Sequence, residues 1–75
     1  MTMQKYNYNA KAKEVQRIYK LRYKPTIMCD LKAALEWAEG CEKSQFVMLG
    51  DDCKYWVVCP ADAWSLIVAG YEYAE

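Results

Sequence analysis

The chain has 75 residues and no histidine, and its ten lysines and arginines are balanced by ten aspartates and glutamates. A chain of this length has a thin core, and we expect a single domain over residues 1–75. Its 55% hydrophobic content argues against disorder, and no apolar run approaches the roughly 18 residues that a membrane-spanning helix needs.

The N-terminal third of the chain has two competing interpretations. Polar and apolar side chains alternate over residues 5–13 and again over residues 19–24, which is the period of a strand. Tyrosine, valine and isoleucine also favour strands, so we expect two strands here. The alternative is one helix from Ala10 to Arg22, because apolar residues also recur within this range at helical spacing.

A helix is expected next, from Asp30 to Glu39. Aspartate is a favoured N-cap residue, and Gly40 is a natural stop. The apolar stripe of this helix consists of Leu31, Ala34, Leu35 and Ala38.

The clearest pattern in the chain is a β-hairpin from Gln45 to Val58. Two runs rich in apolar, β-branched and aromatic residues flank a turn at residues 50–53. Because both runs are apolar on both faces, we expect the hairpin to lie in the centre of a sheet, covered on both sides.

A second helix is expected from Pro60 to Ala69. Proline suits the first helical position, Asp62 complements the helix dipole, and Gly70 follows as a stop. The residues that recur at helical spacing are Trp64, Ile67, Val68 and Tyr71.

These elements predict an α+β fold with a four-stranded antiparallel sheet and two helices, in the order ββαββα. With a helix in place of the first hairpin, the order is ααββα. If both helices cover one face of the sheet, its other face is open and carries tyrosine and basic side chains of the first hairpin and part of the apolar second hairpin. A face so apolar would suggest a partner or a homodimer.

No catalytic or cofactor motif is recognisable, so we expect neither an enzyme nor a cofactor. Histidine, the commonest general base, is absent. The nearest pair of cysteines, Cys53 and Cys59, has five residues between its members, which is wider than zinc sites use, so we expect no metal site. Cys59 precedes a helix start, which can activate a thiol, but a buried structural cysteine is the preferred interpretation.

Charge is divided along the chain. Residues 1–28 carry seven cations and Glu14 alone, for a net +6, and residues 29–75 carry three cations and nine carboxylates, for a net −6. The basic third also interleaves tyrosines with its cations, as surfaces that bind single-stranded nucleic acid do. The candidate partner-binding residues are Tyr6, Tyr8, Arg17, Tyr19, Lys20, Arg22, Tyr23 and Lys24.

The segment from Phe46 to Tyr73 resembles the tail of small phage, prophage and bacterial proteins with no assigned activity. The hairpin that leads into Pro60-Ala61-Asp62 and the closing Gly70-Tyr71-Glu72 carry this resemblance. Cys53 stands where such tails have glycine, and Cys59 where they have threonine. The element order is also loosely similar to that of small anti-CRISPR proteins.

The expected function is therefore that of a non-enzymatic phage or mobile-element protein that occupies a macromolecular partner. An anti-CRISPR-like inhibitor of a host defence complex is the leading form, with a host protein or ribonucleoprotein as partner. The alternative is a single-stranded nucleic-acid-binding protein that uses the basic third. The N-terminal residues lack the apolar core of a signal peptide, so a cytoplasmic location without membrane association is expected.

Overall fold

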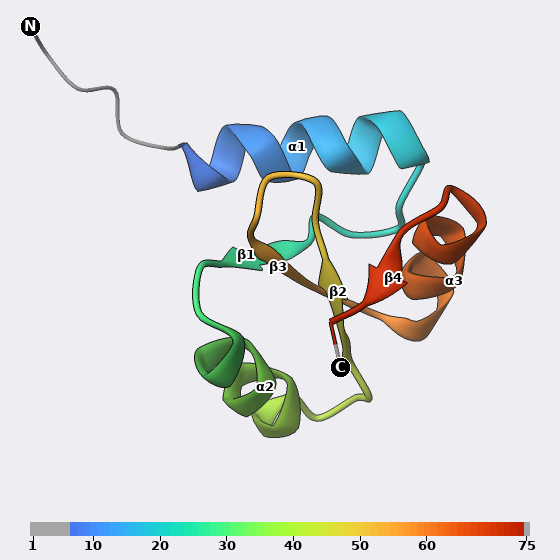
Figure 1. The fold of residues 1–75 in the computed structure, drawn as a ribbon. Coiled ribbons are helices and arrows are strands. Elements are labelled where there is room, and N and C mark those ends of the chain that lie inside the picture. Colours follow the sequence, from blue (N-terminus) through green and yellow to red (C-terminus); the bar gives the residue numbers. More distant parts are fainter. Residues whose placement is uncertain (1–6, 75) are drawn as a thin grey trace, which may run out of the picture.

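The computed structural model describes residues 7–74, which form three helices and a four-stranded antiparallel sheet (Figure 1). In chain order the elements are α1 (Tyr8–Tyr19), β1 (Thr26–Met28), α2 (Leu31–Gly40), β2 (Phe46–Leu49), β3 (Tyr55–Val58), α3 (Pro60–Val68) and β4 (Glu72–Tyr73). The strand order in the sheet is β1-β3-β2-β4. The predicted α+β class and four-stranded antiparallel sheet are confirmed.

The two strands preferred for the N-terminal third are wrong, and the helix alternative is right. The Asn7 side chain caps α1 by accepting a hydrogen bond from the Ala10 N–H at 3.0 Å. Ala12 and Val15 are buried against the sheet. This packing outweighs the strand propensity of the tyrosines, which is a weak preference by comparison. The helix ends at Lys20, whose backbone is left-handed (φ 54°).

The predicted hairpin is confirmed as β2 and β3, which are the two central strands. Its register pairs Phe46 with Val58 and Leu49 with Tyr55. Two short edge strands that the sequence pattern did not predict complete the sheet. β1 pairs with β3, and β4 pairs with β2.

Helices cover both faces of the sheet, so the expected open sheet face is not found. In Figure 1, α1 and α2 lie on opposite sides of the strands. The larger core joins α1 and α3 to one face around Trp56, Met48 and Leu66, each fully buried. The smaller core packs Ala34 of α2 against Val47 and Val57 on the other face. The basic helix α1 and the acidic helix α2 are therefore separated by the sheet.

The other two helices begin where the sequence predicts. Asp30 caps α2 by accepting a hydrogen bond from the Ala33 N–H at 2.9 Å, and Pro60 is the first residue of α3. Within residues 7–74, no helix has the length and apolar character needed to cross a membrane.

Candidate binding surface

Exposed cations gather along the outer side of α1 and on the loop that follows it. Lys13 and Arg17 are four residues apart on the helix, so they lie on one face about one turn, roughly 6 Å, apart. The loop continues this surface from the end of the helix. We name the cationic surface by its exposed members: Lys13, Arg17, Lys20, Arg22, Tyr23 and Lys24.

The loop is held in place by a buried carboxylate. Asp62, in the first turn of α3, is 2% exposed and accepts hydrogen bonds from the backbone N–H groups of Arg22 (2.8 Å) and Tyr23 (3.2 Å). Leu21 and Pro25, on either side of the exposed Arg22-Tyr23-Lys24 triplet, are buried. The three side chains are thus presented by a backbone that is fixed at both ends and clamped in the middle.

Lys20 occupies a backbone conformation that lysine rarely adopts. Its φ of 54° and ψ of 46° are left-handed, and helices usually place glycine or asparagine at such a position. A side chain there costs roughly 1 kcal/mol relative to the right-handed conformation. The chain nevertheless carries a cation at this position, where it adds to the charge of the surface.

Within residues 7–74, the cations of this surface form no salt bridge. Among the described residues, the one salt bridge joins Lys11 to Asp51 at 3.3 Å. Lys24 donates a hydrogen bond to the Asn9 side chain, which is neutral. The acidic helix α2 supplies no partner for these cations, because α2 lies across the sheet from α1. The helix-to-sheet spacing is about 10 Å on each side of the sheet. The distance between α1 and α2 therefore exceeds the screening length of about 8 Å at physiological salt.

Two predicted partner-binding tyrosines, Tyr8 and Tyr19, are not part of this surface. Tyr19 is half-buried and its hydroxyl is hydrogen-bonded to that of Tyr71, which donates to Asp51 at 2.9 Å. Tyr8 lies at the other end of α1, where a hydrogen bond with Cys29 raises the pKa of Tyr8. Tyr6 lies outside the described residues. The structure therefore brings together Arg17, Lys20, Arg22, Tyr23 and Lys24 from the predicted set.

Tyr71 makes the free energy of unfolding depend on pH in the alkaline range. Burial and hydrogen bonds with Tyr19 and Asp51 raise the pKa of Tyr71 above 10.0. Above pH 10 the unfolded chain therefore loses a proton that the folded chain keeps, and the free energy of unfolding must fall as pH rises. We expect Tyr71→Phe to reduce this fall, measured by urea unfolding at about pH 8 and about pH 11. Tyr23→Phe is the control; an unaltered decline in Tyr71→Phe would refute the assignment.

The outer face of α3 is a second exposed feature, and it is apolar. We name it by its exposed residues: Pro60, Ala61, Trp64 and Val68. Trp64 is 66% exposed and Val68 is 70% exposed. The sequence grouped both with Ile67 and Tyr71 in one stripe, but only Ile67 and Tyr71 pack against the core. The sequence does carry a sign of this exposed apolar face. Apart from Asp62 and Ser65, α3 is apolar on all sides, and a helix of this kind is normally covered by other parts of the protein or by a partner.

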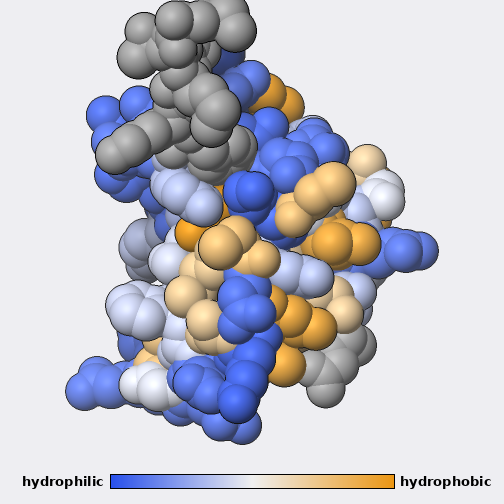
Figure 2. Space-filling view, turned by 60° about the vertical axis from the view of Figure 1, so that its left-hand side comes forward, coloured by the Kyte–Doolittle hydropathy of each residue, from blue (hydrophilic) through white to orange (hydrophobic). Residues whose placement is uncertain are grey.

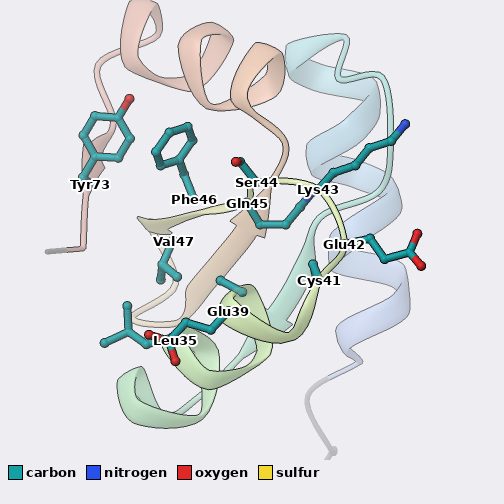
Figure 3. Close-up of a pocket in the computed structure, with 11 residues that line it drawn as sticks. Leu35, Glu39, Cys41, Glu42, Lys43, Ser44, Gln45, Phe46, Val47 and Tyr73 are labelled. Carbon is teal, nitrogen blue, oxygen red and sulfur yellow. The ribbon is translucent and has the colours of Figure 1, made fainter.

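A wide groove of about 700 Å³ lies between the end of α2, the loop at residues 41–45 and the β2–β4 edge (Figure 3). Leu35 and Val47 belong to its apolar lining, and the rings of Phe46 and Tyr73 lie 5.5 Å apart beside it. Glu42 and Lys43 are exposed and, in Figure 3, point away from the groove. This arrangement is typical of a solvated loop over a thin core, and we assign no ligand to it.

A smaller apolar cleft of about 230 Å³ lies beside the edge strand β1 and the first turn of α2. Figure 2 shows apolar patches on this side of the molecule, with hydrophilic side chains around and between them. The cleft is lined by Tyr8, Ile27, Met28, Cys29, Asp30 and Ala33.

Within the described range, no group of three or more histidine, cysteine, aspartate or glutamate side chains could hold a metal ion.

Comparisons with protein-family models, with curated proteins and with solved structures gave no match to this chain. Its function is therefore argued from the two exposed surfaces, one cationic and one apolar.

Proposed function

We propose that this chain is a non-enzymatic binding protein that acts by occupying a macromolecular partner. The observation that carries the proposal is the outer face of α3, where Trp64 and Val68 are exposed and no side chain is charged. Apolar side chains scattered singly are common on protein surfaces, but a contiguous apolar face on a surface helix is typical of an interaction site. Tryptophan is also among the residues most enriched at the energetic centres of interfaces.

The patch is too small to support a stable homodimer by itself. α3 has nine residues and is therefore about 13 Å long. Two copies that met through this helix alone would bury on the order of several hundred Å², against the 1,200–2,000 Å² of stable interfaces. A partner must therefore also contact surface that adjoins α3.

The cationic surface supplies adjoining area. The buried Asp62 in the first turn of α3 accepts hydrogen bonds from the backbone of Arg22 and Tyr23, so the loop of the cationic surface lies against the start of α3. A complementary partner has an apolar pocket for Trp64 next to negative charge. A ribonucleoprotein offers both, because its protein part can form the pocket and its RNA supplies phosphates.

The narrower form of the proposal is an anti-CRISPR-like inhibitor of a host defence complex, encoded by a phage or mobile element. CRISPR effectors are ribonucleoproteins, which fits the required chemistry. The segment that resembles phage and prophage proteins, Phe46 to Tyr73, includes the whole of α3. Small size and the lack of recognisable catalytic motifs in the sequence agree with action by occupancy.

We expect the Trp64→Glu variant to bind a purified CRISPR effector complex at least about 30-fold more weakly than the wild-type chain does. The reason is that a buried charge replaces an aromatic anchor, and such anchors contribute about 2 kcal/mol or more. Titration by biolayer interferometry measures the dissociation constants. Because the side chain is exposed, stability should change by no more than about 0.5 kcal/mol.

The matched control is Trp37→Glu, at a tryptophan that is 52% exposed on α2 across the sheet. This variant should bind like wild type. Equal weakening by both substitutions would remove α3 from the interface. The absence of a complex with purified CRISPR effectors at micromolar concentration would refute the anti-CRISPR form of the proposal.

A further inference from the structure

We infer that the cationic surface is a binding site for single-stranded nucleic acid, with Tyr23 as the base-stacking residue. This inference deepens the proposed function, which sets the cationic surface against the RNA of a ribonucleoprotein, but the site itself consists of residues outside α3. Five exposed cations follow one another along α1 and the loop after it, and none forms a salt bridge with a described carboxylate. Phosphates are the natural partners for such a set, because binding them releases counterions from the nucleic acid.

Tyr23 indicates which kind of polyanion fits. Its ring is 67% exposed and stands between Arg22 and Lys24 on the clamped loop. A cationic track with an exposed aromatic ring is the arrangement that single-strand-binding proteins use, since every unpaired base has a face that can stack. A base in a duplex is already stacked on its neighbours, and an acidic peptide needs no exposed ring.

The loop is also held in one conformation before any ligand arrives. The Asp62 carboxylate fixes the backbone at Arg22 and Tyr23, while the buried Leu21 and Pro25 anchor both ends. Such preorganisation lowers the entropy lost on binding. The left-handed Lys20 adds a cation at a position where glycine would be less strained, as expected where backbone strain serves a function.

The acidic part of the molecule does not block this site. Glu14 is the one carboxylate on α1, and although it is an i,i+3 neighbour of Arg17, it forms no salt bridge with a cation of this surface. The carboxylates of α2 lie across the sheet, beyond the screening length at physiological salt. The net charge of zero therefore conceals a local positive surface.

The test is fluorescence anisotropy with the full chain and a labelled oligothymidine of about 20 nucleotides, from about 50 to about 200 mM salt. If three to five cations contact phosphates, the logarithm of the binding constant should fall against the logarithm of salt with a slope between about −2 and −3.5. Arg17→Gln should reduce this slope by about 0.7. Tyr23→Ala should weaken binding about 5- to 100-fold and leave the slope unchanged.

Two matched controls separate this site from general effects of charge and aromatic content. Lys32→Gln removes an exposed cation from α2, and Tyr73→Ala removes a 47%-exposed tyrosine from β4. Both should bind like wild type. Trp64→Ala removes the aromatic anchor of α3 without adding charge, and it should also leave oligonucleotide binding unchanged, so failure of this site and failure of the proposed α3 interface are distinguishable.

Three outcomes would overturn the inference. The first is no measurable binding at about 50 mM salt. The second is a slope that Arg17→Gln does not alter. The third is that a duplex or polyglutamate binds as tightly as the oligothymidine and that Tyr23→Ala does not weaken binding. The surface would then be a site for polyanions in general or for acidic proteins.

Discussion

Replacing Asp62 with alanine is expected to lower the free energy of unfolding by about 3 kcal/mol. The carboxylate is buried and accepts hydrogen bonds from the N–H groups of Arg22 and Tyr23. Hydrogen bonds to charged groups contribute about 1.5–3 kcal/mol each, and removal of the acceptor leaves two part-buried donors without a partner. Asp62→Asn keeps one carbonyl oxygen and should therefore lose about half as much.

Urea unfolding followed by circular dichroism measures this change, and hydrogen exchange of the Arg22 and Tyr23 amides reports the loop directly. Asp30→Ala is the matched control, because Asp30 is exposed and caps α2 through one hydrogen bond. Its expected loss is about 1 kcal/mol. If Asp62→Ala destabilises no more than Asp30→Ala, the clamp is not what holds the loop.

The second large effect is expected for Gly50→Ala, in the turn before β3. A Cβ atom there would lie far inside van der Waals contact with Cε2 and Nε1 of Trp56, and 2.7 Å from Oδ1 of Asp52. Trp56 is 0% exposed and packs in the larger core, so its ring has no room to move aside. Overpacking of this kind costs about 3 kcal/mol or more.

Gly40→Ala is the matched control, since no atom lies within 4 Å of a Cβ built at Gly40. Gly40 is the last residue of α2, where alanine is a better helix former. The urea midpoint of the Gly40→Ala variant should therefore be unchanged or slightly raised. Equal stability of the Gly50→Ala and Gly40→Ala variants would show that the turn can shift away from Trp56.

The parts of the fold that the sequence predicted are those with local signals. Asp30 caps α2 and Pro60 starts α3, and both effects act within one helical turn. The hairpin was predictable because two apolar runs flank turn residues. Its turn holds Cys53 at φ 61°, which glycine adopts without strain.

The N-terminal third was not predictable in the same way, because its signals conflict. Alternating tyrosines and cations match a strand, whereas Asn7, Ala12 and Val15 match a capped helix. Burial against Trp56 and Met48, which lie far away in sequence, decides between them. The edge strands β1 and β4 have only three and two residues, which is too short for a periodic pattern.

The sequence indicated which residues of the cationic surface lie together better than it indicated how the fold arranges them. Arg17, Lys20, Arg22, Tyr23 and Lys24 do lie together, but on a helix end and a clamped loop rather than on one face of a strand. The clamp requires a residue 39 positions away from Tyr23, and no local pattern announces it. Exposure of Trp64 was missed because helical spacing identifies a stripe without saying which side of it is covered.

Site-specific photo-crosslinking tests the central claim, that this protein occupies a macromolecular partner through α3, most directly. A photoreactive amino acid replaces Trp64 in one variant and Trp37 in another, and each is irradiated with purified CRISPR effector complex. We expect an adduct to one effector subunit from position 64 and none from position 37. No adduct from position 64, or identical adducts from both positions, would contradict it.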